Sequence, residues 1–139
     1  MTRVDFYVLA SAPPLGRERV ACRLADKAFQ HGQKLYIHAE SDAQVRALDE
    51  LLWTFRQQSF IPHARAGGDD APVLIGCGEQ QPPADWPLLI NLNAEAPAFF
   101  SRFERLMEIV DGDEERRVQG RARFRFYQDR GYPLQTHKL

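Results

Sequence analysis

The stretch RVDFYVLASAPPLGRERVACRLADKAFQHGQKLYIHAESDAQVRALDELLWTF, residues 3–55, carries the strongest fold signal in the chain. Residues 3–9 and 34–38 are short runs rich in β-branched and aromatic side chains, which is typical of buried strands. Between them, residues 17–31 place their apolar side chains on one helical face, and Gly32 follows as a C-terminal stop. The stretch therefore predicts a strand, a helix and a second strand.

The same alternation continues along the chain. Ser41 is placed to cap a second helix, and Gln44 stands three residues on, in capping-box spacing. Residues 72–76 and 88–92 are further apolar runs that predict buried strands. The β-α-β-α-β order predicts an α/β fold, a three-layer sandwich with a Rossmann-like, mostly parallel sheet, organised as a single domain over residues 1–139.

The last third is less regular. Pro97 is well placed to open a third helix that runs through Phe103. Residues 105–110 either extend that helix or form a fifth strand, and periodicity does not decide between the two. Asp113 can cap a last helix, and the tail at 132–139 is expected to fold back or fray.

Composition excludes several classes of protein. The chain has 139 residues, 44% of them hydrophobic and 27% charged, which is enough to build a core and argues against disorder. The net charge of −1 argues against a general nucleic-acid binder, so we expect no direct nucleic-acid contact. No apolar run approaches the roughly 20 residues that span a bilayer, so we expect a cytoplasmic protein that does not enter the membrane.

No motif for a cofactor, a metal or catalysis is found. The first strand–helix turn, ASAPPLGRERV, has one glycine and two prolines, and prolines lack the N–H groups that would hold a phosphate. The four histidines show no metal-site spacing, and Cys22 and Cys77 are expected to be buried, reduced thiols. A small Rossmann-like nucleotide-utilising enzyme stays as the alternative, supported only by the predicted order of strands.

Arginine and aromatic residues alternate near the C-terminus. Residues 116–130, RRVQGRARFRFYQDR, hold six arginines and one acid. Arg117, Arg121 and Phe124 recur at spacings that put them on one helical face, directed outward. Because a guanidinium pairs with a carboxylate through two hydrogen bonds, this face suits an anionic peptide with an apolar group.

The same helix carries a neighbouring apolar stripe. This stripe consists of Val118, Ala122 and Phe126, and its apolar character predicts that it faces the core. Gly120 weakens the helix by roughly 1 kcal/mol relative to alanine and is expected to allow a peptide backbone to approach closely. Arg125 and Tyr127 are expected at the rim of the site.

A second apolar region follows the second helix. One helical face cannot bury Leu48, Leu51, Leu52, Trp53 and Phe55 together. Some of these side chains must therefore form an apolar patch with Phe60 and Pro62, of the kind that protein interfaces use, unless Trp53 and Phe60 turn inward to the core.

Four segments of the chain resemble a known family. The block LDELLWTFRQQSFIPHARAGG at residues 48–68 is similar to the signature of the chi subunit family of bacterial DNA polymerase III. The runs FYVL at 6–9, LLINL at 88–92 and FYQDRGYPLQTH at 126–137 are similar to that family at the same relative positions.

The resemblance implies a non-catalytic bridging subunit with a Rossmann-like fold and no bound nucleotide. One surface of such a subunit binds the psi subunit of the polymerase, and the same surface can take a helicase-like repair protein. Another surface binds the acidic, phenylalanine-terminated C-terminal tail of single-stranded DNA-binding protein.

Two sets of site residues follow from the resemblance. The psi-facing pair would be Trp53 and Phe60. The tail-binding set would be Val110, Arg117, Arg121 and Phe124. Arg117 stands where the family pattern leads us to expect lysine, and Phe124 stands where we expect tyrosine. The charge and the ring are kept, but the hydroxyl group is lost.

Overall fold

The computed structural model describes residues 1–55 and 60–139. These residues form one sheet of seven parallel strands in the order β3-β4-β2-β5-β6-β1-β7. The strands are β1 (Arg3–Val8), β2 (Leu35–Ala39), β3 (His63–Arg65), β4 (Val73–Cys77), β5 (Leu88–Asn91), β6 (Arg105–Val110) and β7 (Leu134–Lys138). The helices are α1 (Gly16–Gln30), α2 (Asp42–Thr54) and α3 (Glu114–Asp129), with one 3-10 turn, η1 (Phe100–Arg102).

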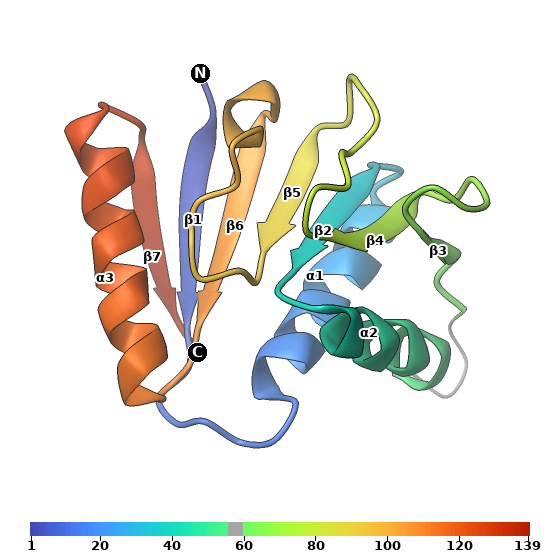
Figure 1. Cartoon of the computed structure of the whole chain (residues 1–139), viewed down its shortest axis with the longest axis horizontal. Coiled ribbons are helices and arrows are strands. Elements are labelled where there is room, and N and C mark those ends of the chain that lie inside the picture. The colour runs from blue at the N-terminus through green and yellow to red at the C-terminus, as the bar shows by residue number, and fades with distance from the viewer. Residues whose placement is uncertain (56–59) are drawn as a thin grey trace.

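Two apolar layers lie on opposite faces of the sheet. On one face, α1 and α2 pack on the central strands through residues such as Val20, Leu52 and Ile90. On the other face, Tyr127 of α3 joins a second cluster with Phe6 of β1 and with the segment around η1. Figure 1 shows α3 beside β7 at one end of the sheet and α2 beneath β4 at the other end. The predicted three-layer α/β sandwich is confirmed, and its sheet is wholly parallel in the described residues.

The predicted helix caps are present. The Ser41 hydroxyl accepts a hydrogen bond from the Gln44 N–H at 3.1 Å. The Gln44 side chain reaches back to the N–H of Glu40 at 2.8 Å, one residue before the cap. Asp113 accepts from the N–H of Arg116 at 3.0 Å and so fixes the first turn of α3.

The helix predicted from Pro97 through Phe103 is wrong. That segment contains only the turn η1, and Arg105–Val110 is the strand β6. The rings of Phe99, Phe100 and Phe103 are nonetheless all buried in the second apolar layer. Their spacing reflects a loop that covers the sheet before the chain enters β6.

The C-terminal tail is not frayed, because it folds back onto the sheet as the edge strand β7 and pairs with β1. The buried carboxylate of Asp5 holds it there: Oδ1 lies 3.0 Å from His137 Nε2, and Oδ2 lies 2.6 Å from Arg105 Nε. Burial alone raises the pKa of Asp5, but the hydrogen bonds from His137 and Arg105 outweigh it and lower the pKa. The His137 ring also stacks on Tyr7 at 4.7 Å.

The core-facing stripe predicted for α3 is wrong for two of its three residues. Val118 is 55% exposed and Ala122 is also exposed, whereas Gly120, Arg123 and Tyr127 face the sheet. Of the predicted stripe, only Phe126 is half-buried and packs on the second apolar layer, as expected. A buried carboxylate on β6, described below, draws Arg123 and Tyr127 inward. These contacts set which face of α3 is turned to the sheet, and it is not the face that the apolar side chains alone predict. Tyr127 therefore lies in the core and not, as expected, at the rim of the binding site.

Helices that could span a membrane, clusters of side chains that could hold a metal ion and disulfides are all absent from the described residues. No helix among the described residues has both the length and the apolar character that crossing a bilayer requires. Within 1–55 and 60–139, no three His, Cys, Asp or Glu side chains are grouped so as to hold a metal ion. Both cysteines are free: Cys22 is buried, and burial raises its pKa to about 12, but Cys77 is only partly buried.

Candidate functional site

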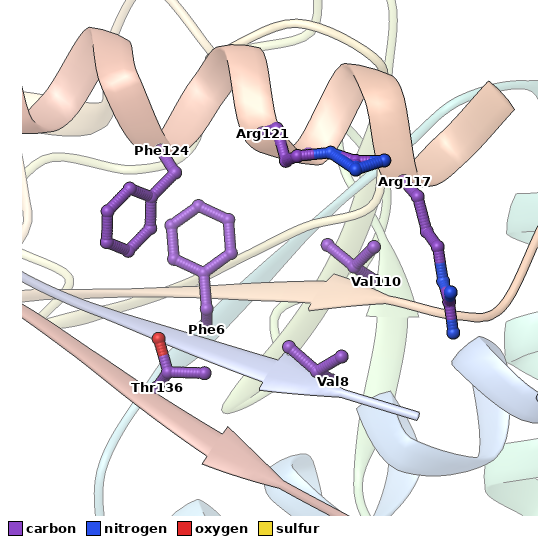
Figure 2. A pocket seen from close by; sticks show the side chains of 8 residues that line it. Phe6, Val8, Val110, Arg117, Arg121, Phe124 and Thr136 are labelled. Atoms are coloured by element: carbon purple, nitrogen blue, oxygen red, sulfur yellow. The ribbon is translucent and has the colours of Figure 1, made fainter. Parts of the chain in front are cut away.

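A pocket of about 220 Å³ lies between α3 and the strands β6, β1 and β7. Its walls come from four separate parts of the chain, as Figure 2 shows. The lining residues are Phe6, Val8, Val110, Arg117, Gly120, Arg121, Phe124 and Thr136. Most of them are apolar, and the two charged residues among them are both arginines.

Gly120 makes this pocket possible by bringing α3 close to β6. A Cβ atom at Gly120 would lie 2.9 Å from Cγ2 of Val110, which is closer than such atoms approach in proteins. The close approach expected of Gly120 is therefore made to Val110 of the chain's own sheet. It leaves the Val110 side chain in the floor of the pocket.

Two aromatic rings form one end of the pocket. The centroids of Phe6 and Phe124 are 5.3 Å apart with their planes tilted by 59°, a favourable arrangement for aromatic pairs. Figure 2 shows the two rings side by side, with Val8 and Val110 farther along the pocket. Phe124 is half-buried, so part of its ring stays available to a ligand.

The two arginines of the pocket have spare hydrogen-bonding capacity. Arg117 Nη2 donates to the carbonyl of Ala10 at 3.2 Å and makes no ion pair with the described residues. Arg121 is exposed, and no acid in 1–55 or 60–139 pairs with it. A guanidinium has five N–H donors, so both side chains can still bind a carboxylate.

All four residues predicted for tail binding line this pocket: Val110, Arg117, Arg121 and Phe124. Sequence reasoning missed the wall opposite them, which Phe6, Val8 and Thr136 form. The alternation of β1 signals that Phe6 and Val8 share a face, but only the tertiary fold shows that this face lies under α3. No local signal places Thr136 there, because β7 itself was not predicted.

A buried polar cluster fixes α3 beneath the pocket. The Glu108 carboxylate is fully buried and accepts from Arg123 Nε at 2.9 Å, from the Tyr127 hydroxyl at 2.6 Å and from the Asn91 amide at 3.0 Å. Burial raises the pKa of Glu108, against the opposing effect of these donors. Burial and the nearby carboxylate raise the pKa of Tyr127 as well. These contacts set the rotation of α3 and thereby direct Arg117 and Arg121 outward.

A second candidate surface lies at the far end of the sheet. Trp53 is 56% exposed and Phe60 is 55% exposed, and their ring centroids are 4.9 Å apart. The His63 ring packs edge-on against Trp53 at 5.0 Å, and its Nε2 lies 3.1 Å from Asp49 Oδ1. The predicted exposed patch is therefore present and is backed by a polar contact. Residues 56–59 of the family-like block lie outside the described residues.

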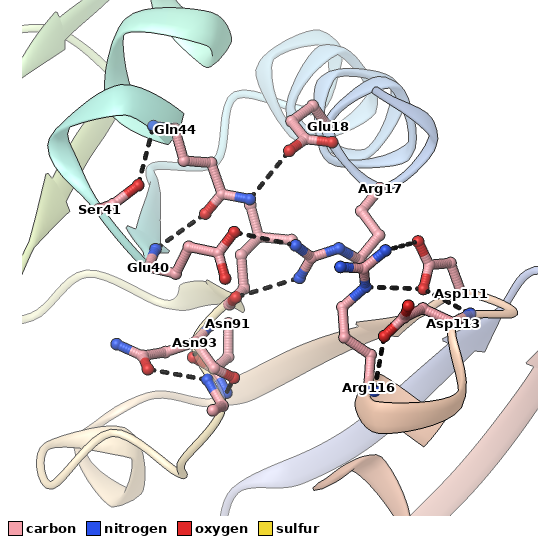
Figure 3. A network of polar contacts seen from close by, with 12 residues as sticks. Arg17, Glu18, Glu40, Ser41, Gln44, Asn91, Asn93, Asp111, Asp113 and Arg116 are labelled. Carbon is pink, nitrogen blue, oxygen red and sulfur yellow. Dashed lines mark hydrogen bonds and ion pairs between the residues drawn. The ribbon is translucent and has the colours of Figure 1, made fainter. Parts of the chain in front are cut away.

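The carboxyl ends of β2, β5 and β6 form the crevice where open parallel sheets commonly bind ligands. Here that crevice is closed by ion pairs, shown in Figure 3. Arg17 Nη2 lies 3.1 Å from Glu40 Oε1, and Arg116 grips Asp111 with two bonds of 2.8 Å. The space left is about 20 Å³, which is room for about one water molecule. This filling argues against the nucleotide-utilising alternative.

Comparisons with known proteins identify the family of the chain. A family model described as "DNA polymerase III chi subunit, HolC" matches residues 1–135. The DNA polymerase III subunit chi of Pseudomonas aeruginosa is 50% identical over 141 residues, covering 100% of this chain and 98% of the relative. The proteins of the same name from Haemophilus influenzae and Escherichia coli are 31% and 28% identical, covering 97% and 98% of this chain and 96% and 97% of the relatives. The chain therefore belongs to the DNA polymerase III chi subunit family, an accessory and non-catalytic subunit of that polymerase.

Proposed function

We propose that this chi subunit is a protein–protein adaptor in DNA replication. Its α3 pocket binds the acidic, phenylalanine-terminated C-terminal tail of single-stranded DNA-binding protein, and its Trp53–Phe60 patch binds the psi subunit. The observation that carries the proposal is the pocket, because an apolar cavity meets two arginines that make no ion pair with the described residues. Such an adaptor acts in the bacterial cytoplasm and has no need of direct contact with DNA.

The pocket fits the chemistry of the proposed tail. An apolar cavity of about 150 Å³ is known to hold a benzene molecule, so about 220 Å³ has room for a phenylalanine side chain. Phe6 and Phe124 offer that ring aromatic partners, and Val110 offers an apolar floor. The terminal carboxylate and the preceding acids are then within reach of Arg117 and Arg121.

The charge of the pocket favours an anionic ligand, and the net charge of the whole chain disfavours a general nucleic-acid binder. No acid is among the residues that line it, yet the whole chain has a net charge of −1. A protein that coats single-stranded DNA presents many tails, so weak individual contacts gain strength through multivalency. Single contacts of this kind weaken with salt, because exposed charges are screened.

The patch at the other end of the sheet suits a hydrophobic partner. Exposed aromatic side chains surrounded by polar residues are the usual centres of protein interfaces. Trp53 and Phe60 touch each other and are both more than half exposed. This surface is proposed for the psi subunit and, by the same chemistry, for a helicase-like repair protein.

The decisive experiment is a fluorescence titration with a peptide that ends in acidic residues and phenylalanine. The intact peptide should bind at low salt, and the peptide that lacks the terminal phenylalanine should not. If the intact peptide fails to bind, the tail-binding proposal is wrong.

A pair of variants tests whether the two surfaces are separate. Trp53→Ala should abolish co-purification with psi and leave peptide binding unchanged. Arg121→Ala should weaken peptide binding and leave co-purification with psi unchanged, so each variant is the control for the other. Loss of both activities in Trp53→Ala would show that Trp53 supports the fold instead of a partner.

A further inference from the structure

We propose that the peptide in the α3 pocket continues as an extended strand along the outer edge of β7. This inference rests on the proposed function and adds to it a mode of binding, in which main-chain hydrogen bonds of the sheet hold the ligand. The occupant is an acidic C-terminal peptide whose last aromatic ring fills the pocket.

The outer edge of β7 has unpaired main-chain groups. β7 is the last strand of the sheet, and among the described strands it pairs with β1 alone. The Val4 N–H donates to the Pro133 carbonyl at 2.9 Å, and the Leu139 N–H donates to the Val8 carbonyl at 2.9 Å. The main-chain N–H and C=O groups of the odd-numbered residues of β7 therefore face β1. Because main-chain groups alternate along a strand, those of Leu134, Thr136 and Lys138 point away from the sheet.

That edge is continuous with the pocket. The Thr136 side chain lines the pocket together with Phe6 and Val8. In Figure 2, β7 runs along the open side of the pocket, with Thr136 facing the Phe6 side chain. A chain that leaves the pocket beside Thr136 thus passes directly along unpaired N–H and C=O groups. Strand addition of this kind supplies affinity through the main chain, and a side-chain pocket supplies specificity.

The charges around the edge select the occupant. Arg117 and Arg121 border the pocket on the helix side, and exposed Lys138 shares the pocket face of β7 with Thr136. These cations favour an acidic peptide. They disfavour a second copy of this chain paired edge to edge, because each copy would bring the same cations to the contact.

Amide hydrogen exchange tests the proposal in the full-length chain. On addition of the peptide used above, exchange of the Thr136 and Lys138 N–H groups should slow by about tenfold or more, since each gains a hydrogen bond. The N–H groups of Gln135 and His137 face β1, so they should be protected equally in both states and are internal controls.

The outcomes separate this inference from the proposed function. If Phe124 signals shift while the Thr136 and Lys138 amides exchange at their free rates, the peptide binds without strand addition and only the inference is wrong. If neither Phe124 nor β7 responds, both proposals are wrong.

A substitution and a modified ligand give independent tests. Thr136→Pro removes an outward N–H at an edge position that tolerates proline, whereas Thr136→Ala keeps it. The proline variant should bind the peptide about tenfold more weakly than the alanine variant. Peptides N-methylated at successive positions should lose affinity at every second position. A uniform response along the peptide would overturn strand addition even if Thr136→Pro proved unstable.

Discussion

Arg116 and Arg117 are neighbours in the sequence, yet they belong to two regions with opposite character. Arg116 lies in the crevice at the carboxyl ends of the strands, where its guanidinium is held by both oxygens of Asp111. Arg117 lies in the α3 pocket, where it has only a carbonyl as partner. The crevice is polar and nearly filled, and its charged groups are paired. The pocket is apolar and open, and the cations that border it make no ion pair within residues 1–55 and 60–139.

The difference shows how to locate a binding site in a Rossmann-like fold. Topology points to the crevice, because ligands of open parallel sheets commonly bind there. Unsatisfied bonding capacity points to the pocket instead. In the crevice the charged groups pair with each other, so we infer that they hold the loops together and that the ligand binds at α3.

The largest effect is expected for the buried cation of α3. Arg123→Ala leaves the Glu108 carboxylate buried without its guanidinium partner, and such a loss costs about 3–5 kcal/mol of stability. Urea unfolding of the variant measures this cost. Arg121→Ala, two residues away and exposed, is the matched control and should change the free energy of unfolding by less than about 0.5 kcal/mol. If both variants lost the same free energy of unfolding, the ion pair of Arg123 with Glu108 would not stabilise the fold.

The next effect concerns the aromatic wall of the pocket. Phe124→Ala removes a ring that packs on Phe6 and should weaken peptide binding by about 2 kcal/mol, or roughly thirtyfold. Phe124→Tyr keeps the ring and should bind within about threefold of the parent chain. Calorimetric titration gives both values. An unchanged affinity in Phe124→Ala would place the ligand elsewhere.

A tenfold effect is expected from an arginine of the pocket but not from its crevice counterpart. Arg121→Ala removes a charged donor to the peptide and should weaken binding by about 1.5 kcal/mol, or roughly tenfold. Arg116→Ala removes a cation that is already paired with Asp111 and should leave the affinity nearly unchanged. If Arg116→Ala weakens peptide binding as much as Arg121→Ala does, the proposed contrast between crevice and pocket is wrong.

The smallest effect is the pH dependence that the crevice contributes. Burial alone raises the pKa of Asp111, but hydrogen bonds from Arg116 and from the Asp113 N–H lower it below its usual value of 3.8. The stability from this group is fully present above the unfolded pKa and is lost as the pH falls through the lower folded pKa. Urea unfolding between about pH 5 and pH 2 should therefore lose stability more steeply in the parent chain than in Asp111→Asn. If the stability of the two proteins fell equally with pH, Asp111 would not be a source of the pH dependence.

Much of the fold could be predicted from local signals. Capping residues and apolar periodicity were sufficient for α1, α2 and the central strands, because those signals lie within each segment. β7 could not be predicted in this way, since LQTHK has no alternation of its own and depends on contacts of Asp5 with His137. β3 is only three residues long, which is too short for an alternating pattern to indicate a strand.

The candidate site was predicted in part, for reasons that can be named. Family-like motifs and helical spacing identified Arg117, Arg121 and Phe124, which all lie on the pocket wall. The phase of the remaining α3 residues was wrong, because a buried carboxylate on β6 draws a charged side chain into the core. Pattern reasoning assigns arginine to the surface, and only the tertiary partner reverses that assignment.

We propose that the ligand binds in the α3 pocket and not in the crevice. Titrating the isotope-labelled chain with the acidic, phenylalanine-terminated peptide and, separately, with ATP tests it by NMR. The peptide should shift the signals of Val110, Phe124 and Thr136 and leave Glu40 and Asn93 unchanged, and ATP should shift none of them. Shifts at Glu40 and Asn93 on addition of ATP, with no response of the pocket to the peptide, would contradict it.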